Sequence, residues 1–464
     1  MHRLCKHIKT YIKLYYSSVS NVYFILKRLS SLFFYLLLCK KAIVFLIALV
    51  SLMPISHLVY AQQNIPGVVA SIGKGEPTVR DPNLKVETVA TGLMLPTTMA
   101  FAAPDDILVL EKDKGTVQRI VNGQMLDEPL LKVNVSSEVE RGMLGIAVSK
   151  NNQTGKSYVF LYFTESESER KEERGGGGEG EPIASRLYRY ELTNNNTKLV
   201  NPKLLLDLPA VPGPRHNAGN IMIGPDNNLY VSVGDLDGHI TMAQNVKDGV
   251  GPDGSSAILR ITQDGQASPK EGILGDSGIT KKYYAYGIRN TYGMDFDPVT
   301  GKLWDTENGP SYGDEINLVE PGFNSGWVKV QGMTPVDFNS EQALVNFQGK
   351  GNYSNPEFVW TDTVGPTAIK FLESDRLGRQ YENDAFVSDI TQGNIYHFDL
   401  NANRTQLVLE GVLADKIANN ATEKEGIIFG EGFGGVTDLE VGPYDGFLYA
   451  VSLGHGAIYR IVSG

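Results

Sequence analysis

The stretch Gly213–Asp237, GPRHNAGNIMIGPDNNLYVSVGDLD, places a histidine in a Gly/Pro-rich loop before two short apolar segments. The run Gly224–Asn228 separates the segments and is typical of a turn, so the stretch predicts a hairpin. A hairpin brings strand ends to one edge, so we expect His216 and Asp235 to lie close together. A histidine beside a carboxylate is a base with an orienting partner. For a lone histidine, hydrogen bonding within its own loop is the commoner role, so the rest of the chain must decide.

The same unit of apolar strand, turn and second strand recurs along the chain. Six copies, most of them about seventy residues apart, begin at Thr97, Leu144, Gly219, Tyr292, Thr367 and Val436. This spacing is too long for solenoid repeats and predicts an all-β fold, a six-bladed β-propeller of four-stranded antiparallel blades. Leu84–Leu93 has no unit of its own, and we expect it to form the outer strand of the last blade.

The N-terminus differs from the rest. Residues 1–61 contain eight Lys/Arg and no Asp or Glu, with an apolar run at Ala42–Met53 and small residues near Ala61. This pattern predicts a signal peptide or a membrane anchor, and therefore an exported protein with possible membrane anchoring. Residues 62–83 are predicted to be a linker, and residues 84–464 the propeller. Both cysteines, Cys5 and Cys39, lie in the leader, so no disulfide is expected after it.

Charge excludes one class of partner. Without the leader, 34 Lys/Arg face 53 Asp/Glu, which gives a net charge of −19. So acidic a surface repels nucleic acid, and it could attract cations.

Two further stretches carry candidate site residues. Arg289 and Asn290 precede a predicted strand and would put a cation and an amide on the same edge, which suits an anionic ligand. An arginine that joins two blades is equally compatible with this motif. Gly309 and Pro310 offer backbone carbonyls, and Asp314 and Glu315 offer carboxylates, all oxygen ligands that calcium prefers. The two carboxylates could instead pair with an arginine of the adjoining blade.

Other loops are expected at the same edge. Gly322–Trp327 (GFNSGW) is either the wall of a pocket or part of the core. Glu140, at the entry to the second unit, and Trp360, at the entry to the fifth, are candidate substrate residues. His239, His397 and His455 lie in predicted strands or turns, the sequence assigns them no acidic partner, and they are expected to be structural. The chain contains no phosphate-binding glycine loop after a strand, no zinc spacing and no GxSxG nucleophile elbow between a strand and a helix.

The ordered motifs RGMLGIAV, PRHNAGNIMIGPDNNLYVSVGD, YGIRNTYGMDFDPVTGKLW, ENGPSYGDEINLV and GFNSGW resemble those of the soluble glucose/sorbosone dehydrogenases. The resemblance runs from Leu84 to the C-terminus. It implies a six-bladed propeller that uses pyrroloquinoline quinone (PQQ) and Ca²⁺ to oxidise a sugar and pass electrons to an extracytoplasmic acceptor.

The resemblance also implies roles for single residues. His216 falls on the catalytic base and Asp235 on the carboxylate that orients it. Arg289 and Asn290 fall on cofactor contacts, and the carbonyls of Gly309 and Pro310 on calcium ligands. Asp314 and Glu315 fall in an acidic segment beside a further calcium site, and Glu140 takes the place of a glutamine near the substrate.

The last two units depart from the family pattern. Family members carry a lysine and two arginines against the cofactor's carboxylates, and here these positions are Thr391, Gly435 and Thr437. Losing three charged hydrogen bonds of about 1.5–3 kcal/mol each weakens binding by several kcal/mol. Two functions therefore stay open: a PQQ-dependent sugar dehydrogenase, and a cofactor-free propeller that binds carbohydrate or protein outside the cell. A propeller lactonase, a third hypothesis, would need a cage of carboxylates around a central metal.

Overall fold

The computed structural model describes residues 75–150, 155–167, 180–193, 195–238 and 240–464. The chain divides into two units, Met1–Val68 and Val69–Gly464, and all described residues belong to the second. The predicted leader and His239 lie outside them. Within the described ranges, no helix is both long and apolar enough to cross a membrane.

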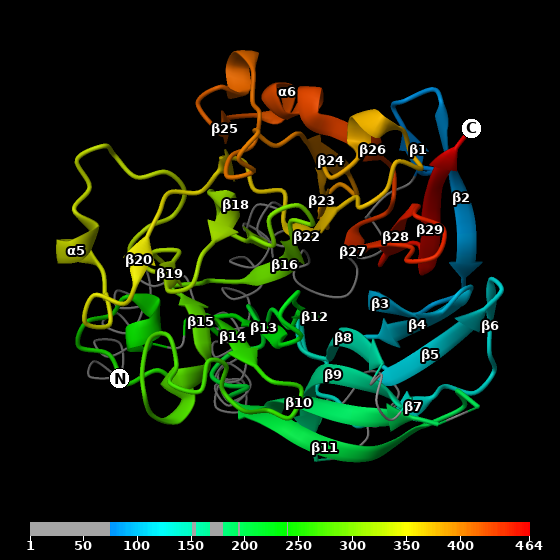
Figure 1. The fold of residues 1–464 in the computed structure, drawn as a ribbon, viewed down its shortest axis with the longest axis horizontal. Helices are drawn as coiled ribbons and strands as arrows, with labels where there is room; N and C mark the ends of the chain where they lie inside the picture. Colours follow the sequence, from blue (N-terminus) through cyan, green and yellow to red (C-terminus); the bar gives the residue numbers. More distant parts are fainter. Residues whose placement is uncertain (1–74, 151–154, 168–179, 194, 239) are drawn as a thin grey trace, which may run out of the picture. The chain divides into compact units, whose positions relative to one another are not determined.

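The described strands form six sheets (Figure 1). The first three contain β3 (Pro96–Ala103), β4 (Asp106–Glu111), β5 (Thr116–Val121), β6 (Gln124–Met125) and β7 (Leu131–Lys132); β8 (Met143–Lys150), β9 (Ser157–Ser166), β10 (Pro182–Leu192) and β11 (Leu199–Leu208); and β12 (Ile221–Ile223), β13 (Leu229–Val233), β14 (Ala257–Ile261), β15 (Tyr283–Tyr286), β19 (Phe323–Asn324) and β20 (Asn352–Tyr353).

The other three sheets follow in chain order. They contain β16 (Thr291–Phe296), β17 (Leu303–Glu307), β18 (Asp314–Val319), β21 (Phe358–Trp360) and β25 (Ile417–Ala418); β22 (Pro366–Phe371), β23 (Ala385–Asp389), β24 (Ile395–Phe398), β26 (Ile428–Glu431) and β1 (Thr78–Val79); and β27 (Val436–Val441), β28 (Leu448–Ser452), β29 (Ala457–Ser463) and β2 (Leu84–Thr91). The helices of the described part are short: η2 (Met242–Gln244), η3 (Gly278–Lys282), α5 (Ser340–Ala343), η4 (Arg379–Tyr381), η5 (Gly411–Leu413), α6 (Ala421–Lys424) and η6 (Glu425–Ile427).

The innermost strands of the six sheets form a closed cycle of contacts. In the order β3, β8, β12, β16, β22 and β27 each strand contacts the next, and β27 contacts β3 (Figure 1). Six clusters of buried apolar side chains lie one at each junction between neighbouring sheets. Burial of both faces of each sheet by its neighbours is the arrangement of a β-propeller, which confirms the predicted all-β propeller fold.

The chain ends join as expected. Strand β2 pairs with β29 along its length, from Leu84 opposite Ser463 to Thr91 opposite Ala457. The predicted outer strand of the last sheet is therefore confirmed.

Two details of the prediction are wrong. Only two sheets have four strands, and the others have five or six. The added strands include parallel pairs, β15 with β19, β19 with β20 and β21 with β25. Outer strands leave backbone donors and acceptors unpaired, and passing loops satisfy them by pairing there. For the same reason Thr78–Val79, inside the predicted linker, forms β1 against β26.

Candidate active site

His216 and Asp235 meet at one edge of the third sheet. His216 precedes β12 and Asp235 follows β13, and the antiparallel pairing of these strands brings the two residues together. The Nδ1 atom of His216 lies 2.5 Å from Asp235 Oδ1. The Asp235 side chain is 1% exposed and that of His216 is 12% exposed, so only the histidine is accessible. The predicted pair is present.

The second ring nitrogen of His216 fixes the tautomer. Arg289 Nη2 lies 2.6 Å from His216 Nε2. A guanidinium group only donates, and an ionised carboxylate only accepts. Nδ1 therefore carries the hydrogen that Asp235 accepts, and Nε2 carries a lone pair. This is the form of imidazole that can take up a proton.

Glu140 holds the histidine loop in place. Its Oε2 accepts hydrogen bonds from the backbone nitrogen of His216 at 2.7 Å, from Asn290 Nδ2 at 3.2 Å and from the Tyr292 hydroxyl at 3.2 Å. Glu140 was predicted to face a substrate, and the structure instead gives this oxygen a role inside the protein. The loop needs such support because His216 has a positive φ of 56°, which side-chain-bearing residues rarely adopt.

A glycine is required opposite the histidine. A Cβ atom at Gly234 would lie 2.0 Å from the His216 carbonyl oxygen. Only glycine lets the two backbones approach this closely.

Trp327 is a site residue that the sequence left undecided. Its Nε1 donates to Asp235 Oδ2 at 2.8 Å, and the Arg289 guanidinium lies 5.4 Å from its ring centroid. Trp327 thus holds the far side of the carboxylate and one face of the arginine. The motif GFNSGW indicated this position, but the sequence did not show whether the tryptophan lines a pocket or belongs to the core.

The prediction that Trp360 faces a substrate is wrong. Trp360 is 1% exposed and packs among Phe358, Tyr396 and Phe398 in the cluster between the fourth and fifth sheets. It ends β21, which pairs with β18 on one side and β25 on the other. The indole is buried because the fifth sheet packs Tyr396 and Phe398 against it.

Arg289 and Asn290 differ in whether their polar atoms are free to bind a ligand. Asn290 is 2% exposed and binds the Ala218 backbone nitrogen and Glu140, so its polar atoms are used within the protein. Arg289 donates to the Asn308 carbonyl at 2.8 Å, but its Nε is buried without a hydrogen-bond partner. Burial lowers the pKa of the Arg289 guanidinium. An arginine in this state would gain from an anionic acceptor.

Three carboxylates are buried on β17 and β18, and one of them, Glu307, accepts from the Arg289 backbone nitrogen. Glu307 and Glu315 lie directly opposite each other on β17 and β18, and Asp305 lies two residues before Glu307. All three are at most 5% exposed. Burial, and then the charge of Asp305, raises the pKa of Glu307 to about 8, and burial raises that of Asp305 to about 7. Like charges directly opposite each other on paired strands are destabilising, so this set favours a bound cation or a retained proton.

Asp314 has a different role from its predicted one as a free metal ligand. Its Oδ1 accepts from the Gly309 nitrogen at 2.8 Å, and its Oδ2 accepts from the nitrogens of Val364 and Gly365 at 2.6 and 2.8 Å. Asp314 therefore positions the Gly309–Pro310 turn. Glu307 was not among the predicted site residues. It fits the expected role of Asp314 as a metal ligand better, because it lies opposite Glu315 on the paired strands.

In the last two sheets, the positions that were expected to bind the cofactor provide few polar groups that are free to do so. Thr391 is exposed in the turn after β23. The Thr437 hydroxyl donates to the Pro96 carbonyl at 3.0 Å, which joins the last sheet to the first. Its hydrogen is therefore used within the fold.

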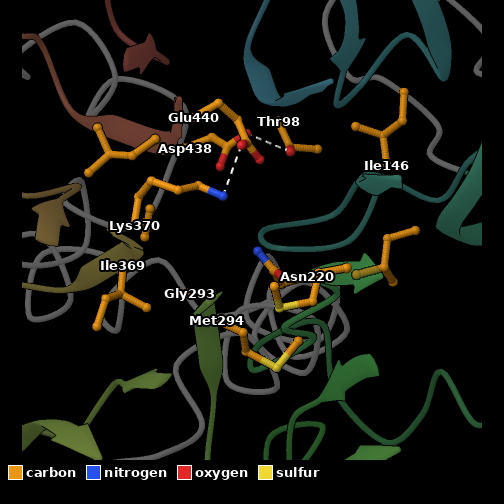
Figure 2. A pocket seen from close by; sticks show the side chains of 13 residues that line it. Thr98, Ile146, Asn220, Gly293, Met294, Ile369, Lys370, Asp438 and Glu440 are labelled. Carbon is orange, nitrogen blue, oxygen red and sulfur yellow. Dashed lines mark hydrogen bonds and ion pairs between the residues drawn. The ribbon is translucent and has the colours of Figure 1, made fainter. Parts of the chain in front are cut away.

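A second charged cluster lies along the axis of the propeller (Figure 2). Lys370 Nζ lies 2.9 Å from Glu440 Oε2 and 3.5 Å from Asp295 Oδ1, and the Thr98 hydroxyl donates to Asp438 at 2.7 Å. Of these residues, Thr98, Lys370, Asp438 and Glu440 line a pocket to which all six innermost strands contribute. Carboxylates do gather at the centre, as a lactonase would require, but the Lys370 ammonium is the cation among them.

His397 has acidic partners, contrary to the sequence-based expectation. Its Nε2 lies 2.9 Å from Asp384 Oδ2 and 3.7 Å from Asp399 Oδ1. The pairing of β23 with β24 brings both aspartates beside it. The three residues offer possible metal-ligand atoms within 4.8 Å of one another. They flank the ends of β23 and β24 opposite to Thr391, away from His216.

Comparison with known proteins places this geometry in context. A family model described as Glucose / Sorbosone dehydrogenase matches residues 93–460. Among curated relatives, the uncharacterized protein slr1608 of Synechocystis sp. is 26% identical over 341 residues, covering 69% of this chain and 77% of its own. Quinoprotein glucose dehydrogenase B of Acinetobacter calcoaceticus is 25% identical over 292 residues, covering 59% of this chain and 57% of its own. The latter match spans less than two thirds of that relative.

Solved structures share the fold. A putative oxidoreductase (glucose dehydrogenase) from Thermus thermophilus is 26% identical, with a TM-score of 0.61 over 82% of this chain and 100% of its own. The PQQ-bound form of an aldose sugar dehydrogenase from Streptomyces coelicolor is 23% identical, with a TM-score of 0.58 over 84% of this chain and 100% of its own. The second likeness is evidence for the fold alone.

Proposed function

Because the chain belongs to the glucose/sorbosone dehydrogenase family, we propose that it is a PQQ- and calcium-dependent dehydrogenase that oxidises an aldose or related sugar at C1. The observation that carries the proposal is the placement of His216, whose Nδ1 lies beside Asp235 and whose Nε2 faces Arg289. The proposal includes a ring of six blades, one for each sheet.

The chain's own residues account for the proton transfer. His216 Nε2 takes the proton from the anomeric hydroxyl, and the buried Asp235 carboxylate stabilises the imidazolium that forms. Trp327 keeps Asp235 in place from its other oxygen. Arg289 must leave Nε2 before the sugar hydroxyl can reach it, so ligand binding also frees the base. When bound, PQQ supplies the acceptor for the hydride from C1.

The residues present fit an anionic cofactor at Arg289. Its buried Nε has no partner, and an ion pair with a carboxylate would offset the cost of burying the guanidinium. The carbonyls of Gly309 and Pro310 would hold the calcium ion beside the cofactor, and Glu315 with Glu307 would hold a further one.

The first experiment is a calorimetric titration of PQQ into the full-length protein, with and without calcium. We expect saturable, calcium-dependent binding, followed by reduction of a dye acceptor when an aldose is added. Absence of binding at tens of micromolar PQQ would contradict the proposal. It would favour the second candidate, a propeller that binds carbohydrate or protein, which the uncharged Thr391, Gly435 and Thr437 support.

Calcium is expected to stabilise the protein through the buried carboxylates. A ligand present at one hundred times its Kd adds about 2.7 kcal/mol to the stability of the folded state. Calcium should therefore raise the thermal midpoint, and a chelator should lower it. In Glu315→Gln this response should shrink, whereas Glu320→Gln, at an exposed surface pair with Lys302, should respond like the wild type. An equal response in all three proteins would exclude Glu315 as a ligand.

We also propose that the protein is exported and passes electrons to an extracytoplasmic acceptor. The basic, apolar leader of residues 1–61 supports export. Proteolysis of intact cells or separation of the exported fraction would test it.

A further inference from the structure

Lys424 presents a buried ammonium group without a carboxylate partner. The residue ends α6, in the connection between β24 and β26, and is 7% exposed. Its Nζ donates to Gln392 Oε1 at 2.9 Å. Within the described ranges, no carboxylate oxygen lies within ion-pair distance of it. A buried ammonium facing one neutral oxygen is costly for folding.

Asp389 is the carboxylate whose charge acts on Lys424, but its oxygens already accept hydrogen bonds from other groups. Burial raises the pKa of Asp389, and the charge of Lys424 opposes that rise. Asp389 accepts from the Tyr396 hydroxyl at 2.7 Å and from the nitrogens of Gln392 and Gly393 at 2.6 and 2.9 Å. Asp389 therefore stabilises the turn after β23 and is not the direct partner of the ammonium.

The backbone around Lys424 is fixed on both sides. Strand β25 pairs with β21 before it, and β26 pairs with β24 and β1 after it. Asn420 caps α6 by accepting from the nitrogens of Thr422 and Glu423. The paired strands before and after Lys424 and the capped helix therefore fix its position next to Gln392.

Lys424 lies at the same edge of the propeller as His216. Gln392 follows β23 as Asp235 follows β13, and both strands are second from the axis in their sheets. A series of contacts joins the two places. Arg289 donates to Asn308, Asn308 donates to Pro366, and the neighbouring Gly365 carbonyl accepts from Ile390, next to Thr391.

We propose that Lys424 is a binding subsite for a carboxylate of the ligand that His216 and Arg289 also serve. The proposal rests on the proposed function, in which that ligand is PQQ, a tricarboxylate. Lys424 then supplies a positive charge beside the position of Thr391, from a segment 33 residues later in the chain. On binding, its ammonium exchanges the neutral Gln392 oxygen for a carboxylate.

The test compares PQQ affinity and apo-protein stability in matched variants of the full-length chain. Lys424→Met keeps the stem and removes the charge, and we expect PQQ to bind roughly 10- to 100-fold more weakly, as for loss of one charged hydrogen bond. Lys424→Arg should keep most of the affinity. Lys416→Met is the control, because Lys416 belongs to the same connection but pairs with Glu357 at 2.7 Å, and its affinity should equal that of the wild type.

Stability separates a binding role from a structural one. Replacing a buried ammonium that has no carboxylate within ion-pair distance by methionine should leave the thermal midpoint of the apo protein unchanged or raise it. A lowered midpoint for Lys424→Met, or unchanged PQQ affinity while the wild type binds, would overturn the role of Lys424 alone. Absence of binding by the wild type would overturn the proposed function and the subsite with it.

Discussion

Replacing His216 with asparagine is expected to lower turnover by a factor of roughly 10²–10⁴, the usual contribution of a general base. Asparagine retains a polar group near Asp235 but has no nitrogen that can take up a proton at neutral pH. The loss should therefore appear in kcat, with the affinity for PQQ changed little. Steady-state rates with a dye acceptor and calorimetric titration of PQQ measure the two quantities.

A second histidine–carboxylate pair provides the control. His397 lies 2.9 Å from Asp384, in a different sheet and at the opposite strand ends from Thr391. His397→Asn removes the same type of contact, and its turnover should match that of the wild type. Full turnover in His216→Asn, or an equal loss in both variants, would contradict the assignment of His216 as the base.

Of the substitutions proposed for this protein, Lys370→Met should lower the free energy of unfolding the most. Lys370 is the cation beside Asp438 and Glu440 in the axial pocket (Figure 2), and it also lies 3.5 Å from Asp295, which is not part of the pocket lining. Removing one partner of a buried ion pair costs about 3–5 kcal/mol, and we expect about 3 kcal/mol because Glu440 keeps 31% exposure. Chemical denaturation measures this difference.

Two variants test the cause of that loss. Lys302→Met breaks an exposed pair with Glu320 and should cost about 0–1 kcal/mol. Adding Glu440→Gln to Lys370→Met should recover part of the stability, because one uncompensated carboxylate is removed. A Lys370→Met protein as stable as Lys302→Met would show that the axial carboxylates need no cation.

The loss should also depend on pH. Burial, and then the charge of Glu440, raises the pKa of Asp438 to about 8, and burial raises those of Asp295 and Glu440. A carboxyl with a raised folded-state pKa favours folding below its unfolded pKa, and this contribution is lost as pH rises through the folded value. Without Lys370 these carboxyls must stay protonated to be buried, so the stability difference should be larger at pH 9 than at pH 5.

Sequence reasoning located the fold and the central pair through local patterns. The alternation of apolar strands with turns such as Gly224–Asn228 predicts hairpins, and their recurrence predicts a propeller. His216 and Asp235 are joined by one such hairpin. Their proximity therefore depends on contacts between residues only 19 apart in sequence, which a local pattern specifies.

Other features depend on contacts between distant segments, which no local pattern encodes. The bond from Trp327 to Asp235 spans 92 residues, and that from Thr98 to Asp438 spans 340. Trp360 and Trp327 both follow turn-rich stretches, yet only packing between the fourth and fifth sheets buries the first in the core. The partners of Lys370 and Lys424 likewise come from different strands and connections.

The sequence by itself therefore determined the β-propeller, the closure of its ends by Leu84–Leu93 and the His216–Asp235 pair, because hydrophobic period and turn chemistry act over a few residues. The tertiary structure alone decided that the Trp327 indole supports the base and that Asp314 accepts hydrogen bonds from backbone nitrogens. It also decided that Lys370 is the cation among the axial carboxylates and that a lysine near Thr391 comes from α6. These outcomes follow from how six sheets pack around one axis, where the charge and burial of a side chain are set by neighbours from other sheets.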